Sequence, residues 1–223
     1  MKKQWIKKKV NNSGAALVSV VIVIAFVSVL VTTVLYMAGM NYYSKATDRE
    51  TKQSFYEAEI PLEMIKAELM KEAKTAHQKA FEATLPYCAS SGEGERRATY
   101  YSSFTNKLKE QLETKVTNKG TLEGYLDSIV GTAYSADLKV ASTGGLDFTE
   151  MNKGRIYIRG IEMTHIKDGF QTMIKTDVCI LAPELAWGAD AAAPDFDVAD
   201  STTNKRKKID MSDCVLYYNW RKE

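Results

Sequence analysis

The chain has 223 residues, of which 45% are hydrophobic and 26% charged, with 30 Lys and Arg against 28 Asp and Glu. This length is enough for one domain with a buried core and not clearly for two. Five of the basic residues and no acidic residue precede residue 15. The rest of the chain therefore carries a net charge of about −3, and sequence-specific nucleic-acid binding is not expected.

The first predicted element is an apolar helix that directly follows a basic segment. Lys7, Lys8 and Lys9 are followed by residues 10–44, which contain no charged side chain. A helix over residues 14–40 is about 40 Å long, which exceeds the hydrocarbon core of a bilayer, about 30 Å thick. We predict that this helix spans a membrane once. Because the segment before it is purely basic, the N-terminus is expected in the cytoplasm and the C-terminal bulk outside.

The order of these features resembles the class III signal of type IV pilins and type II secretion pseudopilins. The shared pattern is a basic leader, Gly14, a small residue and an unbroken apolar helix, and residues 53–59 are similar to the Phe-x-x-Ala-Glu segment of a minor-pilin subgroup. The resemblance covers about residues 8–70. It implies that a prepilin peptidase cleaves after Gly14, that Ala15 becomes a methylated N-terminus, and that the helix packs in a filament core.

One position departs from the family pattern. The Glu that is usual at the fifth position after cleavage is replaced by Ser19. In the family this Glu is thought to neutralise the N-terminal amine of a neighbouring subunit inside the apolar filament core, where an unpaired charge is costly. The resemblance therefore implies a minor subunit that initiates assembly or lies at the filament tip. The alternative is an uncleaved single-pass membrane protein with an extracellular ligand-binding domain.

The partners and location also follow from the resemblance. The implied partners are the prepilin peptidase, other pilin subunits, the assembly machinery in the membrane, and membrane lipid before assembly. The implied location is the cytoplasmic membrane and, after assembly, a filament on the cell surface.

Three cysteines are expected outside the membrane, where disulfides can form. Cys88, Cys179 and Cys214 allow three single pairings and leave one thiol over. A Cys179–Cys214 pairing resembles the C-terminal disulfide loop of many pilins and would tie the last segment to the sheet. Three buried thiols without a disulfide are the equally open alternative.

A second helical pattern follows the apolar span. Phe55, Ala58, Leu62, Ile65 and Leu69 recur at the three-four spacing of one helical face. Pro61 is expected to kink or interrupt this helix near Ala58, and the helical pattern ends before Pro86. We predict four parts: a leader over 1–14, the membrane or filament-core helix over 15–40, an amphipathic extension over 41–85, and a globular extracytoplasmic domain over 86–223. A separate short helix after a loop is the alternative for the extension.

The remaining elements predict an α+β fold in which the long helix packs on a small antiparallel sheet. In chain order we expect an exposed loop over 90–95, helices over 100–116 and 122–129, a strand over 155–163 with a bulge at Gly160, a hairpin turn at 167–169, a strand over 170–180, a surface loop over 183–213, and a strand over 215–220.

No catalytic or metal-binding motif occurs in the sequence, and neither an enzymatic activity nor a cofactor is expected. His77 and His165 are the only histidines, and both are predicted to lie on solvated surfaces. Residues 205–208 read Lys-Arg-Lys-Lys. We interpret this run as part of a solvated loop, with electrostatic contact to an anionic surface as the alternative.

Overall fold

The computed structural model describes residues 13–87, 92–131, 137–167, 169–184 and 211–222. The chain divides into two compact units, Met1–Glu50 and Thr51–Glu223, and we call the second the head unit. Helix α1 (Ser13–Thr84) supplies residues to both units. The long helix and the antiparallel sheet confirm the predicted α+β class.

The described part of the first unit, residues 13–50, is helical, and its apolar side chains are exposed. Leu17, Phe26 and Leu35 are between 63% and 70% exposed, and other apolar side chains of this segment are similar. Within the described residues, α1 over Ala16–Thr84 is the one helix that is long and apolar enough to cross a membrane. The segment is therefore a candidate membrane span.

The head-unit part of α1 buries the predicted apolar stripe. Ala58, Leu62, Ile65 and Leu69 are fully buried, and three alanines extend the stripe toward the C-terminal end of the helix: Ala73, Ala76 and Ala80. The expectation that Pro61 interrupts the helix is wrong, because the helix is continuous from Ser13 to Thr84. Pro61 removes one backbone hydrogen bond. Packing of the stripe on both sides of this position compensates for that loss, since helices in proteins are stabilised mainly by their buried face.

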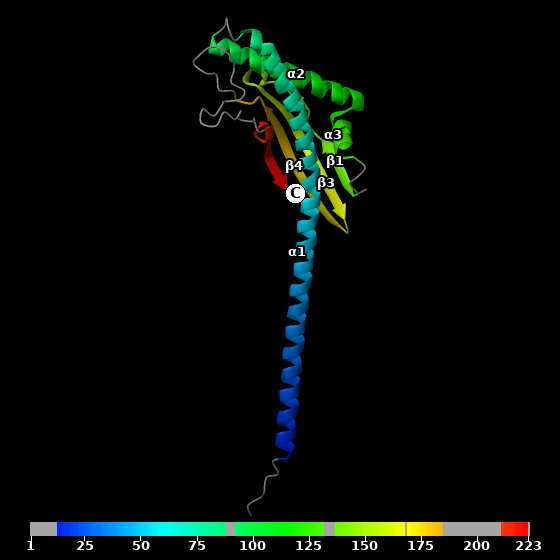
Figure 1. Ribbon diagram of the computed structural model, residues 1–223. Helices are drawn as coiled ribbons and strands as arrows, with labels where there is room; N and C mark the ends of the chain where they lie inside the picture. The colour runs from blue at the N-terminus through cyan, green and yellow to red at the C-terminus, as the bar shows by residue number, and fades with distance from the viewer. Residues whose placement is uncertain (1–12, 88–91, 132–136, 168, 185–210, 223) are drawn as a thin grey trace, which may run out of the picture. The chain divides into compact units, whose positions relative to one another are not determined.

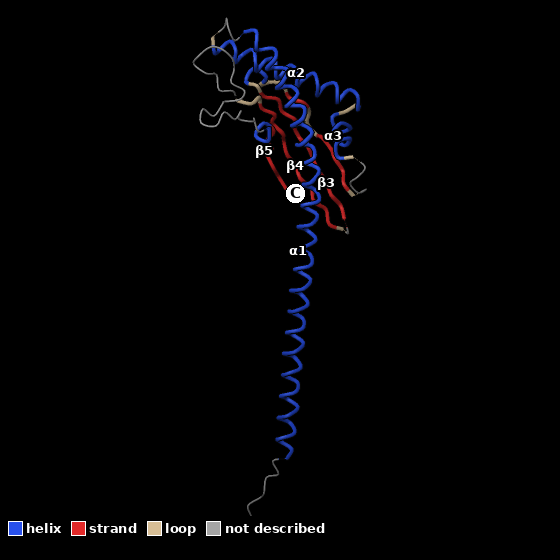
Figure 2. Tube along the Cα trace, viewed as in Figure 1, coloured by secondary structure: helices blue, strands red, loops and turns tan. Residues whose placement is uncertain are grey.

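The sheet of the head unit has five antiparallel strands, and strands are drawn in red in Figure 2. Their bounds are β1 (Leu138–Ser142), β2 (Leu146–Asp147), β3 (Arg155–Lys167), β4 (Phe170–Leu181) and β5 (Val215–Lys222). The order is β1-β3-β4-β5, and β2 pairs with β3 beyond the end of β1. The cyan segment of α1 runs along one face of this sheet in Figure 1.

Strand alternation places the core between α1 and the sheet. Ile156, Ile158, Ile161 and Met163 of β3 are fully buried. The register shifts between Ile158 and Ile161, and Gly160 has a φ of 66°. This confirms the predicted bulge and explains why the buried residues continue on the same face after it.

Two further helices complete the head unit. Helix α2 (Glu93–Lys119) and helix α3 (Leu122–Val130) contain the two predicted helical segments, and α2 begins inside the segment expected to be a loop. Short 3₁₀ turns occur at η1 (Leu85–Tyr87), η2 (Met151–Lys153) and η3 (Met211–Cys214). Residues 185–210 of the predicted loop over 183–213 lie outside the described residues, and the basic run at 205–208 is among them.

Candidate functional site

The residues predicted to direct processing and assembly lie in the first turns of α1. Gly14 and Ser19 are both exposed on this helix, and Ala15 lies between them. A side chain built at Gly14 would have no neighbour within 4 Å. The leader over 1–12 lies outside the described residues, so the structure describes only the C-terminal side of the Gly14–Ala15 bond.

Three hydroxyl groups of the apolar segment are satisfied within the helix. The hydroxyls of Ser28, Thr32 and Thr33 each donate to the carbonyl four residues earlier, at 2.8 Å. These bonds remove the cost of placing a free hydroxyl in an apolar environment. Tyr42 and Tyr43, which follow the apolar run, are 79% and 73% exposed, a position that suits the polar boundary of a membrane. This surface is suited to lipid or to neighbouring helices.

The head unit contains a polar cluster between the start of its α1 segment and the end of β3. The Ser54 hydroxyl lies 2.9 Å from His165 Nδ1, and Glu57 Oε2 lies 2.9 Å from His165 Nε2. Lys167 Nζ lies 3.7 Å from the other oxygen of Glu57. We call these four residues the latch. A carboxylate can only accept, so Nε2 carries a hydrogen and donates to Glu57.

The electrostatics of the latch favour an ionised Glu57. A hydrogen bond from Gln53, together with the charges of Lys167 and His165, holds the pKa of Glu57 below its ordinary value of 4.5, although partial burial acts in the opposite direction. Ser54 and His165 are only 4% and 3% exposed. The prediction that His165 lies on a solvated surface is therefore wrong, since its ring is buried and both nitrogens have partners.

Ser, His and Glu are also the residue types of a hydrolytic triad, but this cluster is not arranged for such chemistry. A nucleophilic hydroxyl must reach a substrate carbonyl. The Ser54 hydroxyl lies inside the contact between helix and sheet, where burial leaves no room for a substrate. The geometry of the latch fits a structural connection between α1 and β3.

His77 likewise differs from its predicted solvated position. Its Nδ1 lies 2.7 Å from the hydroxyl of the buried Tyr100 on α2, and burial lowers the pKa of His77. This contact joins α1 to α2 at the end of the head unit remote from the latch.

A third polar network lies on the face of the sheet turned away from α1. Arg159 donates two hydrogen bonds to Asp147 Oδ2, at 2.9 and 3.1 Å, and one to the Tyr218 hydroxyl at 2.7 Å. Its guanidinium lies 4.6 Å from the centre of the Tyr157 ring.

Asp177 of β4 lies in the same network. It accepts a hydrogen bond from the Gly160 amide at 2.7 Å and one from the Asn219 side chain at 2.8 Å. Because these residues come from β2, β3, β4 and β5, the network cross-braces the sheet at its bulge.

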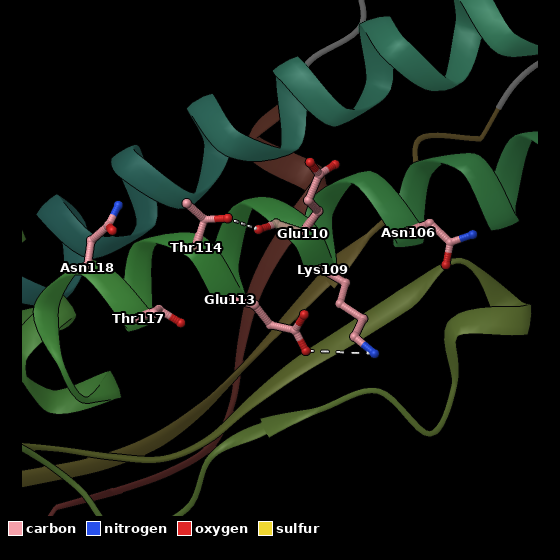
Figure 3. A pocket seen from close by; sticks show the side chains of 7 residues that line it. All are labelled: Asn106, Lys109, Glu110, Glu113, Thr114, Thr117 and Asn118. Carbon is pink, nitrogen blue, oxygen red and sulfur yellow. Dashed lines mark hydrogen bonds and ion pairs between the residues drawn. The ribbon is translucent and has the colours of Figure 1, made fainter.

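The outer face of α2 carries a shallow depression of about 530 Å³, shown in Figure 3. Lys109 and Glu113 in it form an ion pair at 3.7 Å, and the Thr114 hydroxyl donates to the Glu110 carbonyl at 2.7 Å. These groups satisfy one another along one helix, which is typical of a solvated helical face. Among the described residues, no group of three or more His, Cys, Asp or Glu side chains is placed to hold a metal ion.

The predicted Cys179–Cys214 disulfide is not formed in the structure, although both residues are buried. Cys179 lies in β4 opposite Leu216 of β5, whereas Cys214 lies in the 3₁₀ turn η3 before β5 begins. The strand register therefore does not place the two cysteines opposite each other. Cys88 lies outside the described residues.

Comparison with protein-family models, with curated proteins and with solved structures gives no match for this chain. The functional assignment therefore rests on the residues and contacts described above.

Proposed function

We propose that this protein is a minor pilin-like subunit of a type IV pilus or a related filament, acting in assembly initiation or at the tip after prepilin-peptidase cleavage at Gly14. The observation that carries the proposal is the junction at Gly14, where a purely basic leader meets an uncharged helix. A cleavable secretory signal has a shorter apolar region of about 7–15 residues. The uncharged run here continues to residue 44, so cleavage on the cytoplasmic side leaves the helix attached to the head unit.

The properties of α1 support a role in assembly. Its described residues before Thr51 expose apolar side chains, and the hydroxyls of Ser28, Thr32 and Thr33 bond within the helix. Such a helix can exchange lipid contacts for contacts with other helices at little cost, because both environments are apolar. The head unit is a folded domain on the same helix. We infer that it lies outside the cytoplasmic membrane.

Ser19 supports a position at the tip. A Ser hydroxyl cannot neutralise the ammonium group of a neighbouring subunit. A subunit with no neighbour on that side has no such group to neutralise and does not need the Glu. We therefore expect about one copy of this subunit per filament, and we expect its deletion to reduce the initiation of assembly.

N-terminal sequencing and intact-mass measurement of the protein from native membranes test this proposal. The expected mature chain begins at Ala15, and Gly14→Val is expected to retain the leader because a β-branched side chain hinders approach to the scissile bond. Gly39→Val is the matched control, since this exposed glycine lies in the same helix and also has open space around it. It is expected to be processed normally.

A mature chain that begins at Met1, or beyond Met40, would overturn the proposal. The first outcome would favour the uncleaved single-pass protein. Gold labelling of the head unit tests the tip position separately, because label along the shaft would contradict the tip position and leave the pilin proposal intact.

A further inference from the structure

The head unit holds the first turns of its α1 segment differently from the rest of the helix. Over residues 62–69 the contact is made by large apolar side chains, and Leu62, Ile65 and Leu69 are fully buried. Over residues 51–58 the buried positions are Ser54 and Ala58, one polar and one small. The partly buried Phe55 also packs against the core, so this segment is held by two apolar side chains, one small and one partly buried, together with polar contacts.

These contacts come from two strands. On one side, Ser54 and Glu57 bind His165 and Lys167 at the end of β3. On the other side, Lys222 of β5 lies 4.9 Å from the centre of the partly buried Phe55 ring. When the contact opens, the hydroxyl, imidazole, carboxylate and ammonium groups can bind water instead, which offsets part of what each contact contributes.

We propose that the latch opens independently of the core, so that residues 51–58 of α1 leave the sheet while the stripe from Leu62 onward stays packed. Segments at the edge of a core that are held by few apolar contacts open more often than the global structure unfolds. Opening of the latch frees eight more residues of α1, about 12 Å of helix at 1.5 Å per residue. The latch thus sets how much of α1 the head unit holds.

This device is distinct from the proposed filament function, since it concerns the head unit alone. In a single-pass membrane protein or in a filament subunit, opening of the latch lengthens the part of α1 that lies between the membrane-spanning segment and the residues packed on the sheet. Ser54 and Glu57 lie on one side of the contact and His165 and Lys167 on the other, so a change at any one of the four residues shifts the balance between the two states.

The test compares two buried alanines on the same face of α1. Ala58→Cys reports opening beside the latch and Ala73→Cys reports opening of the core, because both positions are fully buried. Full-length protein in detergent micelles is treated with a maleimide, and labelling at each site is quantified by peptide mass spectrometry, which separates these sites from the native cysteines. We expect Ala58→Cys to label about tenfold faster or more, the factor expected for an opening free energy about 1.4 kcal/mol lower.

Substitutions that break the latch should then change the labelling rate of Ala58→Cys and not that of Ala73→Cys. Glu57→Gln, and independently His165→Gln, is expected to raise the labelling rate of Ala58→Cys several-fold and to leave Ala73→Cys unchanged. Glu63→Gln, at an exposed position of the same helix, is the matched control and should change neither rate. Equal rates at the two cysteines in the parent protein would overturn the proposal. So would a Glu57→Gln variant that changes both rates equally or changes neither, and this conservative substitution keeps the test valid if His165→Gln fails to fold.

Discussion

Asp177 offers the sharpest test of how the sheet is held together, because one carboxylate stabilises irregular backbone on two neighbouring strands. One oxygen accepts the Gly160 amide at the bulge of β3, and the other accepts the side chain of Asn219 on β5. Asn219 has a φ of 54°, an uncommon conformation for a residue with a side chain. We expect Asp177→Ala to destabilise the head unit by loosening both strands.

The magnitude follows from the bonds that are lost. Hydrogen bonds to a charged group contribute about 1.5–3 kcal/mol each, and the Asp177 side chain is only 16% exposed, so water replaces them incompletely. A loss of about 3 kcal/mol in the free energy of unfolding is expected for Asp177→Ala. Asp177→Asn keeps an acceptor for the Gly160 amide but loses the charge, and about half of that loss is expected.

Pulse proteolysis of the full-length protein in urea and detergent micelles measures this effect. With a denaturant dependence of about 2 kcal/mol per molar urea, Asp177→Ala should lower the unfolding midpoint by about 1.5 M. Asp137→Asn, at an exposed carboxylate just before β1, is the control. A shift below about 0.3 M for Asp177→Ala would refute the reasoning, since the two bonds would then contribute almost nothing.

Three further predictions follow from other positions. Gly160→Ala should lower the free energy of unfolding more than Gly169→Ala does. Both glycines have positive φ, but of the two only Gly160 would bring an added Cβ against backbone, at 2.8 Å from the Gly144 amide nitrogen. The urea midpoints of the two variants check this. Because the pKa of Glu57 is lowered in the folded protein, its contribution to stability is present above about pH 4.5 and is lost as the pH falls through the lower folded value. The difference in urea midpoint between the parent and Glu57→Gln should therefore shrink between pH 6 and pH 3, and a constant difference would contradict the assignment. Ser19→Glu should hinder membrane insertion by about 2–3 kcal/mol and should not increase assembly, which insertion assays and filament counts measure.

The sequence predicted well those elements whose pattern is long and local. The stripe over Ala58, Leu62, Ile65 and Leu69 identified the buried face of α1, and the alternation of β3 and β4 identified their pairing around a tight turn. β1 and β2 were missed because they have five and two residues, too few for alternation to stand out.

The latch shows why the polar contacts could not be predicted. Periodicity does contain part of the information: Ser54 lies four residues before Ala58 on the buried stripe, and His165 follows Ile161 and Met163 on the buried face of β3. Both residues could therefore have been placed in the interior. Their pairing could not, because it joins positions 111 residues apart and depends on how α1 lies across the sheet.

Closure of the head unit depends on its last strand. The Tyr217 hydroxyl donates to the Leu62 carbonyl, and these residues are 155 positions apart. At the usual pace of synthesis, about 5–20 residues per second, β5 leaves the ribosome roughly 8–30 s after the α1 stripe that it helps to cover. Throughout this interval the stripe lacks part of its cover and can associate with other unfinished chains. Completion of the domain is therefore a late event, and a chain that stalls before β5 presents a partly covered apolar stripe to chaperones and proteases.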